Sequence, residues 1–118
     1  MIDLNQSTEN QKRNSKRILI AEPEPDIQYL YSLFTKQYGF SIADVNIVES
    51  GNKCLEIVLS SINDNNHDYD IIILDIHLRD ISGFEVARKI RDRLPHKIII
   101  LTTTYSLDNI SNTIFILK

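Results

Sequence analysis

Short apolar runs separated by polar segments organise most of this chain. Residues 17–21, 71–74 and 97–101 are dominated by isoleucine and leucine, and residues 44–48 form a weaker run of the same kind. Their short length and β-branched side chains favour strands over helices. The three stronger runs do not alternate with polar residues, which is typical of parallel strands covered on both faces of a sheet.

Apolar residues at helical spacing fill the intervals between these predicted strands. The spacing predicts helices over residues 26–38, 52–62 and 84–94. Pro25 suits the first turn of the first helix, and Gly39 follows its last periodic residue. The alternation of strand and helix predicts an α/β fold with a doubly wound parallel sheet.

The last residues of the chain fit two interpretations. Residues 113–118 (TIFILK) have the composition of a strand, which would be the fifth of the sheet and would end on Lys118. The same region also carries a helical stripe, at Leu107, Ile110, Ile114 and Leu117. We favour the strand, because residues with high β-propensity stand next to one another here.

The composition is that of one globular domain. The 118 residues are 42% hydrophobic and 25% charged, which allows a single buried core. The net charge of −3 offers no basic surface of the kind that direct nucleic-acid binding needs. Cys54 is the single cysteine, so we expect a small buried apolar residue and a cytoplasmic protein without disulfides.

The N-terminal segment predicts neither a signal peptide nor a membrane anchor. Residues 1–16 are polar and lack an apolar central region, so we expect a disordered leader followed by one domain over residues 17–118. No apolar run approaches the roughly 20 residues that a membrane span requires.

Polar side chains end the buried strands, and they carry the candidate chemistry. They are Glu22, Asp75, Thr102 and, if the last segment is a strand, Lys118. Ligands bind at the carboxyl ends of parallel strands, so we expect these side chains to gather at one edge. Carboxylates can hold Mg²⁺ for phosphoryl chemistry, while a hydroxyl and an ammonium group can hydrogen-bond phosphoryl oxygens. The alternative is that each residue is only the polar end of a strand in water.

Four segments resemble the receiver domains of two-component response regulators. They are RILIAEPEPDI at 17–27, DIIILDIHLRDISGFE at 70–85, IIILTT at 98–103 and FILK at 115–118. The second is the most specific, and together the four cover residues 17–118. The resemblance implies a flavodoxin-like, doubly wound parallel sheet with strand order 2-1-3-4-5, shortened at its C-terminal end.

The resemblance also implies a role for each matching residue. Asp75 would accept a phosphoryl group from a histidine kinase as a carboxylate nucleophile. Glu22, Asp75 and the backbone carbonyl of His77 would hold Mg²⁺. Thr102 would hydrogen-bond the phosphoryl group and move toward it, and Lys118 would pair with it.

Three positions depart from the family pattern. Pro23 stands where a second acidic residue is usual, which predicts weak Mg²⁺ binding and slow or absent phosphorylation unless Glu24 takes its place. Arg79 stands where proline is common and adds a cation near the acceptor. Thr103 is bulkier than the usual small residue and is expected to narrow the approach to Asp75.

The C-terminal end is also shorter than the resemblance implies. Lys118 follows Thr102 by only 16 positions, so the fourth helix is reduced to about a turn and the last helix is missing. We expect the uncovered apolar surface to be buried by a partner or by a second copy, unless the chain is a fragment of a longer product.

Two functions compete. The first is a phosphorylatable receiver in a phosphorelay, with a histidine kinase and a downstream signalling protein as partners and no catalysis beyond its own phosphorylation and dephosphorylation. The second is a pseudo-receiver, a protein-binding module without phosphotransfer, which Pro23 favours. An aspartyl phosphohydrolase fits less well, because His77 stands where such enzymes carry a second acid.

Overall fold

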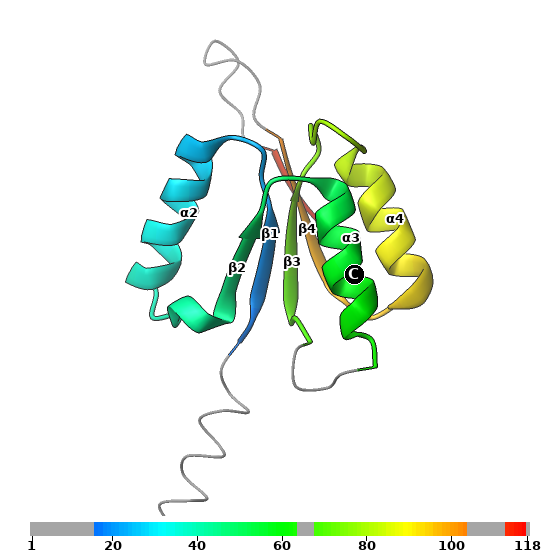
Figure 1. The fold of residues 1–118 in the computed structure, drawn as a ribbon, viewed down its shortest axis with the longest axis horizontal. Helices are drawn as coiled ribbons and strands as arrows, with labels where there is room; N and C mark the ends of the chain where they lie inside the picture. Colours follow the sequence, from blue (N-terminus) through cyan, green and yellow to red (C-terminus); the bar gives the residue numbers. More distant parts are fainter. Residues whose placement is uncertain (1–15, 64–67, 104–112, 118) are drawn as a thin grey trace, which may run out of the picture.

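The computed structural model describes residues 16–63, 68–103 and 113–117, which form one layered α/β domain. The sheet has the strand order β2-β1-β3-β4-β5 (Figure 1). β1 pairs in parallel with β2 and β3, and β3 pairs in parallel with β4. The strands are β1 (Ile18–Ala21), β2 (Val45–Val48), β3 (Ile71–Asp75), β4 (Ile98–Thr103) and β5 (Thr113–Leu117). The predicted strand order and the parallel pairing of the first four strands are therefore confirmed.

Three α-helices connect the parallel strands. They are α2 (Pro25–Gln37), α3 (Gly51–Ser61) and α4 (Gly83–Arg93), with a short 3₁₀-helix η1 (Ile42–Asp44) before β2. α3 and α4 lie together, while α2 stands apart from them across the sheet (Figure 1). All three helices match the sequence prediction to within one or two residues at each end.

Local chemistry explains where these helices begin and end. The Ser50 hydroxyl accepts from the Lys53 N–H, and the Ser82 hydroxyl accepts from the Phe84 N–H, so both α3 and α4 begin with a serine cap. Pro25 occupies the first turn of α2. Gly39 follows this helix with φ +92°, a conformation that favours glycine.

The core lies between the sheet and the helix pair α3–α4. Alternate residues of the central strands point to this face, and each is almost fully buried: Leu19, Ala21, Ile72, Leu74, Ile99 and Leu101. Cys54 packs with them and is fully buried, and burial raises the pKa of its thiol to about 12. The prediction of a buried, apolar cysteine is confirmed.

The other sheet face is covered less completely. No residue of α2 is buried, and its apolar side chains Leu30 and Phe34 are 43% and 52% exposed. On the strands, Ile71, Ile73 and Ile100 are half-buried and Ile98 is exposed. The molecule therefore has one dense core and a second face on which Ile18 and Ile20 are buried while the other apolar groups stay partly in contact with water.

The direction of β5 departs from the sequence prediction. Residues 113–117 do form a strand beside β4, but it runs antiparallel, with Thr113 opposite Thr103 and Leu117 opposite Ile99. Only the nine positions from 104 to 112 separate the two strands. A parallel crossover needs about a dozen residues or more, whereas an antiparallel return needs far fewer.

Two expectations fall outside the described residues. The leader at residues 1–15 and the side chain of Lys118 belong to segments that the structure does not describe. Among the residues that it does describe, no helix is long and apolar enough to cross a membrane.

Candidate phosphoacceptor site

Two buried carboxyl groups face each other at the carboxyl ends of the central strands. Asp75 ends β3 with 3% exposure, and Glu22 follows β1 with 2% exposure. Burial raises the pKa of Glu22 to about 7, against a hydrogen bond from the Glu24 N–H that lowers it. The charge of Asp75 and a hydrogen bond between the two carboxyl groups raise the pKa of Glu22 further. The Glu22 carboxyl group therefore titrates near neutral pH.

The loop after β1 holds Glu22 through its own backbone. The Glu24 N–H donates to Glu22 Oε2 at 2.9 Å, and the Glu22 N–H donates to the carbonyl of Val48 at 2.9 Å. Gln28 Nε2, from α2, donates to the Glu22 carbonyl at 2.6 Å. The Glu22 backbone is thus fixed by the sheet and by α2, and its carboxyl group accepts one N–H from its own loop.

The loop after β3 is equally constrained around Asp75. The His77 N–H donates to Asp75 Oδ1 at 2.6 Å, which orients the carboxylate. The Ile76 N–H donates to the Thr102 carbonyl at 2.8 Å, and the Gly83 N–H donates to the Ile76 carbonyl at 3.0 Å. A Cβ atom at Gly83 would overlap the Asp75 carbonyl oxygen, so α4 can begin this close to the acidic group only with glycine.

Thr102 lies beside Asp75 in the sheet. The two residues are paired in the parallel register of β3 and β4, and the Thr102 hydroxyl donates to the Leu74 carbonyl at 3.4 Å. Tyr31, from α2, is half-buried near this group. Burial raises the pKa of Tyr31, the Thr102 side chain lowers it, and the charges of Glu22 and Asp75 raise it.

Comparison with known proteins decides what this arrangement belongs to. Residues 18–115 match the family model of the response regulator receiver domain. The chain is a member of this family. This receiver domain is therefore of the kind found in proteins of two-component signalling.

Relatives of known description support the assignment. The cell cycle response regulator CtrA of Brucella ovis is 35% identical over 75 residues, which are 64% of this chain and 28% of that protein. The receiver domain thus spans little more than a quarter of the curated relative. The response regulator TrrA of Thermotoga maritima, in complex with Mg²⁺–BeF, is 34% identical with a TM-score of 0.66, over 80% of this chain and 76% of that one.

A second structure shows TrrA with a partner. In the complex with the histidine kinase ThkA, TrrA matches this chain at 33% identity and a TM-score of 0.62, over 81% of this chain and 75% of that one. This likeness supports the receiver fold of the chain.

The departures from the family pattern have structural counterparts in this receiver domain. Pro23 is buried beside Glu22 and brings no carboxylate. Arg79 Nη2 donates to Glu24 Oε1 at 3.0 Å, which joins the loop after β3 to the loop after β1. Both side chains are more than half exposed, so the pair contributes little stability. The pair engages the Glu24 carboxylate, which would otherwise be the substitute for the acidic Mg²⁺ ligand that is missing at Pro23.

No larger acidic cluster compensates for Pro23 in this part of the molecule. Within the described ranges, three or more His, Cys, Asp or Glu side chains do not gather around any common point. Asp80 points elsewhere and accepts from the backbone N–H groups of Gly51 and Asn52, at the start of α3. The receiver domain therefore offers two carboxyl groups at the site, Glu22 and Asp75.

The remaining predicted residues are placed differently. Thr103 points to the opposite face of β4 from Thr102 and is buried, and its hydroxyl has no hydrogen-bond partner among the described residues. Its expected effect on the approach to Asp75 stays a prediction. Lys118 lies outside the described residues, and the preceding Leu117 pairs with Ile99, three positions before Thr102.

Tyr31 is the site residue that sequence reasoning missed. Its position in an apolar helical stripe identified it only as a packing residue. No sequence signal marked it, because an apolar helical period identifies only which side of a helix faces inward.

Proposed function

We propose that this receiver domain accepts a phosphoryl group on Asp75 from a histidine kinase. The observation that carries the proposal is the position of Asp75, buried at the carboxyl edge of the sheet between Glu22 and Thr102. An oxygen of the Asp75 carboxylate would attack the phosphorus atom, form an acyl phosphate and release the donor histidine.

The neighbouring groups support this chemistry. The His77 N–H, 2.6 Å from Asp75 Oδ1, holds the carboxylate in one orientation. Thr102 offers a hydroxyl one strand away that can donate to a phosphoryl oxygen. The proposal does not extend to Lys118, because the preceding Leu117 pairs with Ile99, at the end of β4 away from Thr102.

The donor set fits Mg²⁺ in part. Glu22 and Asp75 are two buried carboxyl groups side by side, and a cation between them would offset their mutual repulsion when both are ionised. These two carboxylates and the backbone carbonyl of His77 would hold the ion, which when bound neutralises charge on the phosphoryl oxygens. The carboxylate missing at Pro23 predicts weak binding.

A pseudo-receiver without phosphotransfer is the second candidate. It is favoured by one observation beyond Pro23, because the Glu24 carboxylate is engaged by Arg79 at 3.0 Å. Such a domain would act as a constitutive protein-binding module. In either case, we propose that the exposed apolar residues on α2 form a contact surface. The partner would be a kinase, a downstream signalling protein or a second copy.

The deciding experiment is an intact-mass measurement after incubation with acetyl phosphate and Mg²⁺. The phosphorylatable receiver predicts a single phosphoryl adduct that is lost in the Asp75→Asn variant. Asp80→Asn is a matched control, because Asp80 lies in the same loop but points to the start of α3. No adduct on a protein with the circular dichroism of a folded α/β domain would support the pseudo-receiver instead.

A further inference from the structure

The segments that follow the parallel strands carry a single strong cation. These segments come after β1, β2, β3 and β4 in the chain and comprise residues 22–24, 49–50, 76–82 and 104–112. Arg79 is the only lysine or arginine in their sequence. Lys118 does not take its place, because Leu117 pairs with Ile99 at the end of β4 away from Thr102.

The backbone that carries Arg79 is fixed on both sides. Two residues before it, the His77 N–H donates to Asp75 Oδ1 at 2.6 Å. Immediately after it, the Asp80 carboxylate accepts from two backbone N–H groups at the start of α3, at 2.9 and 3.0 Å. The loop is therefore anchored to the phosphoacceptor and to a helix, so that only the side chain of Arg79 has to move to meet a group bound at Asp75.

The Arg79 side chain already lies over the acidic pair. Its Nη2 donates to Glu24 Oε1 at 3.0 Å, and the backbone N–H of Glu24 donates to Glu22 Oε2 at 2.9 Å. Because β1 and β3 are paired, Glu22 follows its strand beside Asp75. Two short contacts thus lead from the guanidinium group to the carboxyl groups of the site.

The present partner holds Arg79 only weakly. The side chains of Arg79 and Glu24 are 73% and 58% exposed, and an ion pair in water contributes little free energy. A phosphoryl group offers three strong acceptor oxygens and more than one negative charge. A guanidinium group can bind two of these oxygens at once, which makes the phosphoryl group the better partner.

We propose that Arg79 supplies the cation for a phosphoryl group on Asp75 and exchanges the Glu24 carboxylate for the phosphoryl oxygens. The inference rests on the proposed function of Asp75. No covalent bond changes in this exchange, because the N–H donors of Arg79 pass from one set of oxygens to another. The exchange opens the contact between the loops after β1 and β3, so phosphorylation would alter the surface at the start of α2.

The test compares the affinities of three proteins for beryllofluoride, which imitates a phosphoryl group, at a Mg²⁺ concentration that saturates each of them. The proteins are the unmodified chain, Arg79→Gln and Arg88→Gln. Arg88→Gln is the matched control, because Arg88 is also an exposed arginine, at 61%, that pairs with carboxylates but lies on α4. The affinity of each protein for Mg²⁺ alone is measured separately.

We expect Arg79→Gln to bind beryllofluoride about tenfold more weakly than the unmodified protein, the effect of one charge-assisted hydrogen bond. Arg88→Gln should leave the affinity unchanged. Arg79→Lys should lose less than Arg79→Gln, because an ammonium group keeps the charge without the planar fork. The affinity for Mg²⁺ alone should not fall in Arg79→Gln, since its removal takes away no metal ligand.

A spectroscopic measurement needs no substitution. In the unmodified protein with Mg²⁺, the side-chain N–H resonance of Arg79 should shift when beryllofluoride is added, and that of Arg88 should not. An Arg79 resonance that stays in place overturns the inference.

The outcomes separate this inference from the proposed function. Equal or tighter binding of beryllofluoride by Arg79→Gln, with binding by the unmodified protein, overturns the inference and leaves the proposed function standing. An equal loss in Arg88→Gln also overturns it, because the effect would then be one of overall charge. Failure of the unmodified protein to bind beryllofluoride removes both the proposed function and the inference.

Discussion

At the scale of single residues, Glu22 is held in a state that an isolated carboxyl group would not adopt. It is 2% exposed, receives one N–H donor from Glu24, and has a pKa that burial and the neighbouring Asp75 raise to about 7. Burying two acidic groups together costs free energy unless a proton or a cation separates them. The closeness of the two buried carboxyl groups favours a bound cation. Without Mg²⁺, it also makes the stability of the protein depend on pH.

The pKa of Glu22 predicts how stability varies with pH. Folding raises this pKa from 4.5 to about 7, so the folded protein binds the proton more tightly than the unfolded chain. The contribution is complete below pH 4.5 and is lost as pH rises through about 7. In Mg²⁺-free buffer, we expect the protein to lose about 2 kcal/mol of stability on this account between those pH values.

Urea unfolding across this pH range, monitored by circular dichroism, measures the effect. Glu22→Gln should remove most of this loss of stability. Glu56→Gln should not change the loss, because the Glu56 carboxyl group on α3 is 69% exposed. Equal pH dependence in the unmodified protein and Glu22→Gln would contradict the prediction.

Sequence reasoning found Glu22, Asp75 and Thr102 because each ends a run of apolar residues, and parallel strands bring such ends to one edge. It could not find Tyr31, since an apolar period identifies which side of a helix is inside and says nothing of what its hydroxyl meets. The sequence also could not predict the Arg79–Glu24 pair, because it joins residues of two loops that are 55 positions apart.

At the scale of elements, the start of α4 depends on one missing side chain. Gly83 lies against the backbone of Asp75 and Ile76, and a Cβ atom would meet backbone atoms that cannot turn aside. Alanine is usually better than glycine in a helix by about 1 kcal/mol, but overlap with fixed backbone generally costs more.

We therefore expect Gly83→Ala to destabilise the protein by about 2 kcal/mol in spite of the better helix propensity. Chemical unfolding measures the change. Lys89→Ala, at an exposed position of the same helix, should shift stability by less than about 0.5 kcal/mol. A Gly83→Ala variant as stable as the unmodified protein would show that the loop after β3 can move away from the helix.

The apolar pattern predicted the four parallel strands and three helices because each has a long or strongly apolar signal. The apolar pattern could not predict the direction of β5. It depends on the nine positions between Thr103 and Thr113, whose number limits the connection, and not on the residues of the strand itself.

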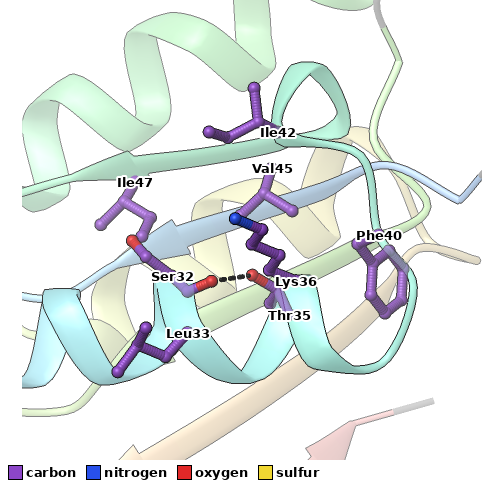
Figure 2. Close-up of a pocket in the computed structure, with 8 residues that line it drawn as sticks. All are labelled: Ser32, Leu33, Thr35, Lys36, Phe40, Ile42, Val45 and Ile47. Atoms are coloured by element: carbon purple, nitrogen blue, oxygen red, sulfur yellow. Dashed lines mark hydrogen bonds between the residues drawn. The ribbon is translucent and has the colours of Figure 1, made fainter.

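At the scale of the whole molecule, the two faces of the sheet differ in how they are covered. The α3–α4 side is a dense core, whereas α2 leaves Leu30, Leu33 and Phe34 exposed at 43–52%. At the far end of this helix, Leu33 and Lys36 line a pocket of about 190 Å³ with Phe40 and Ile42 (Figure 2). Exposed apolar groups this close together are typical of a contact surface.

We expect this surface to associate with a second copy at high protein concentration. Phe34→Glu should keep the protein monomeric where the unmodified chain forms dimers, because a charge at the centre of the surface opposes its burial. Size-exclusion chromatography with light scattering measures the mass. Phe84→Glu is the matched control, since Phe84 is 54% exposed against 52% for Phe34 but lies on α4.

A monomer at every concentration would contradict the expected self-association and leave the surface to other proteins. If Phe84→Glu also prevented dimer formation to the same extent, the dimer contact would include the α4 side.

The central place of β1 in the sheet also has a consequence for biosynthesis. β1 emerges first, yet its two neighbours are β2 and β3, whose residues paired with Ile18 are Val45 and Ile71. On a ribosome, the most apolar strand of the domain must wait until β3 has left the exit tunnel before both its edges can pair. We expect nascent chains that stop before Asp75 to depend on chaperones, since they expose a strand that the finished protein buries completely.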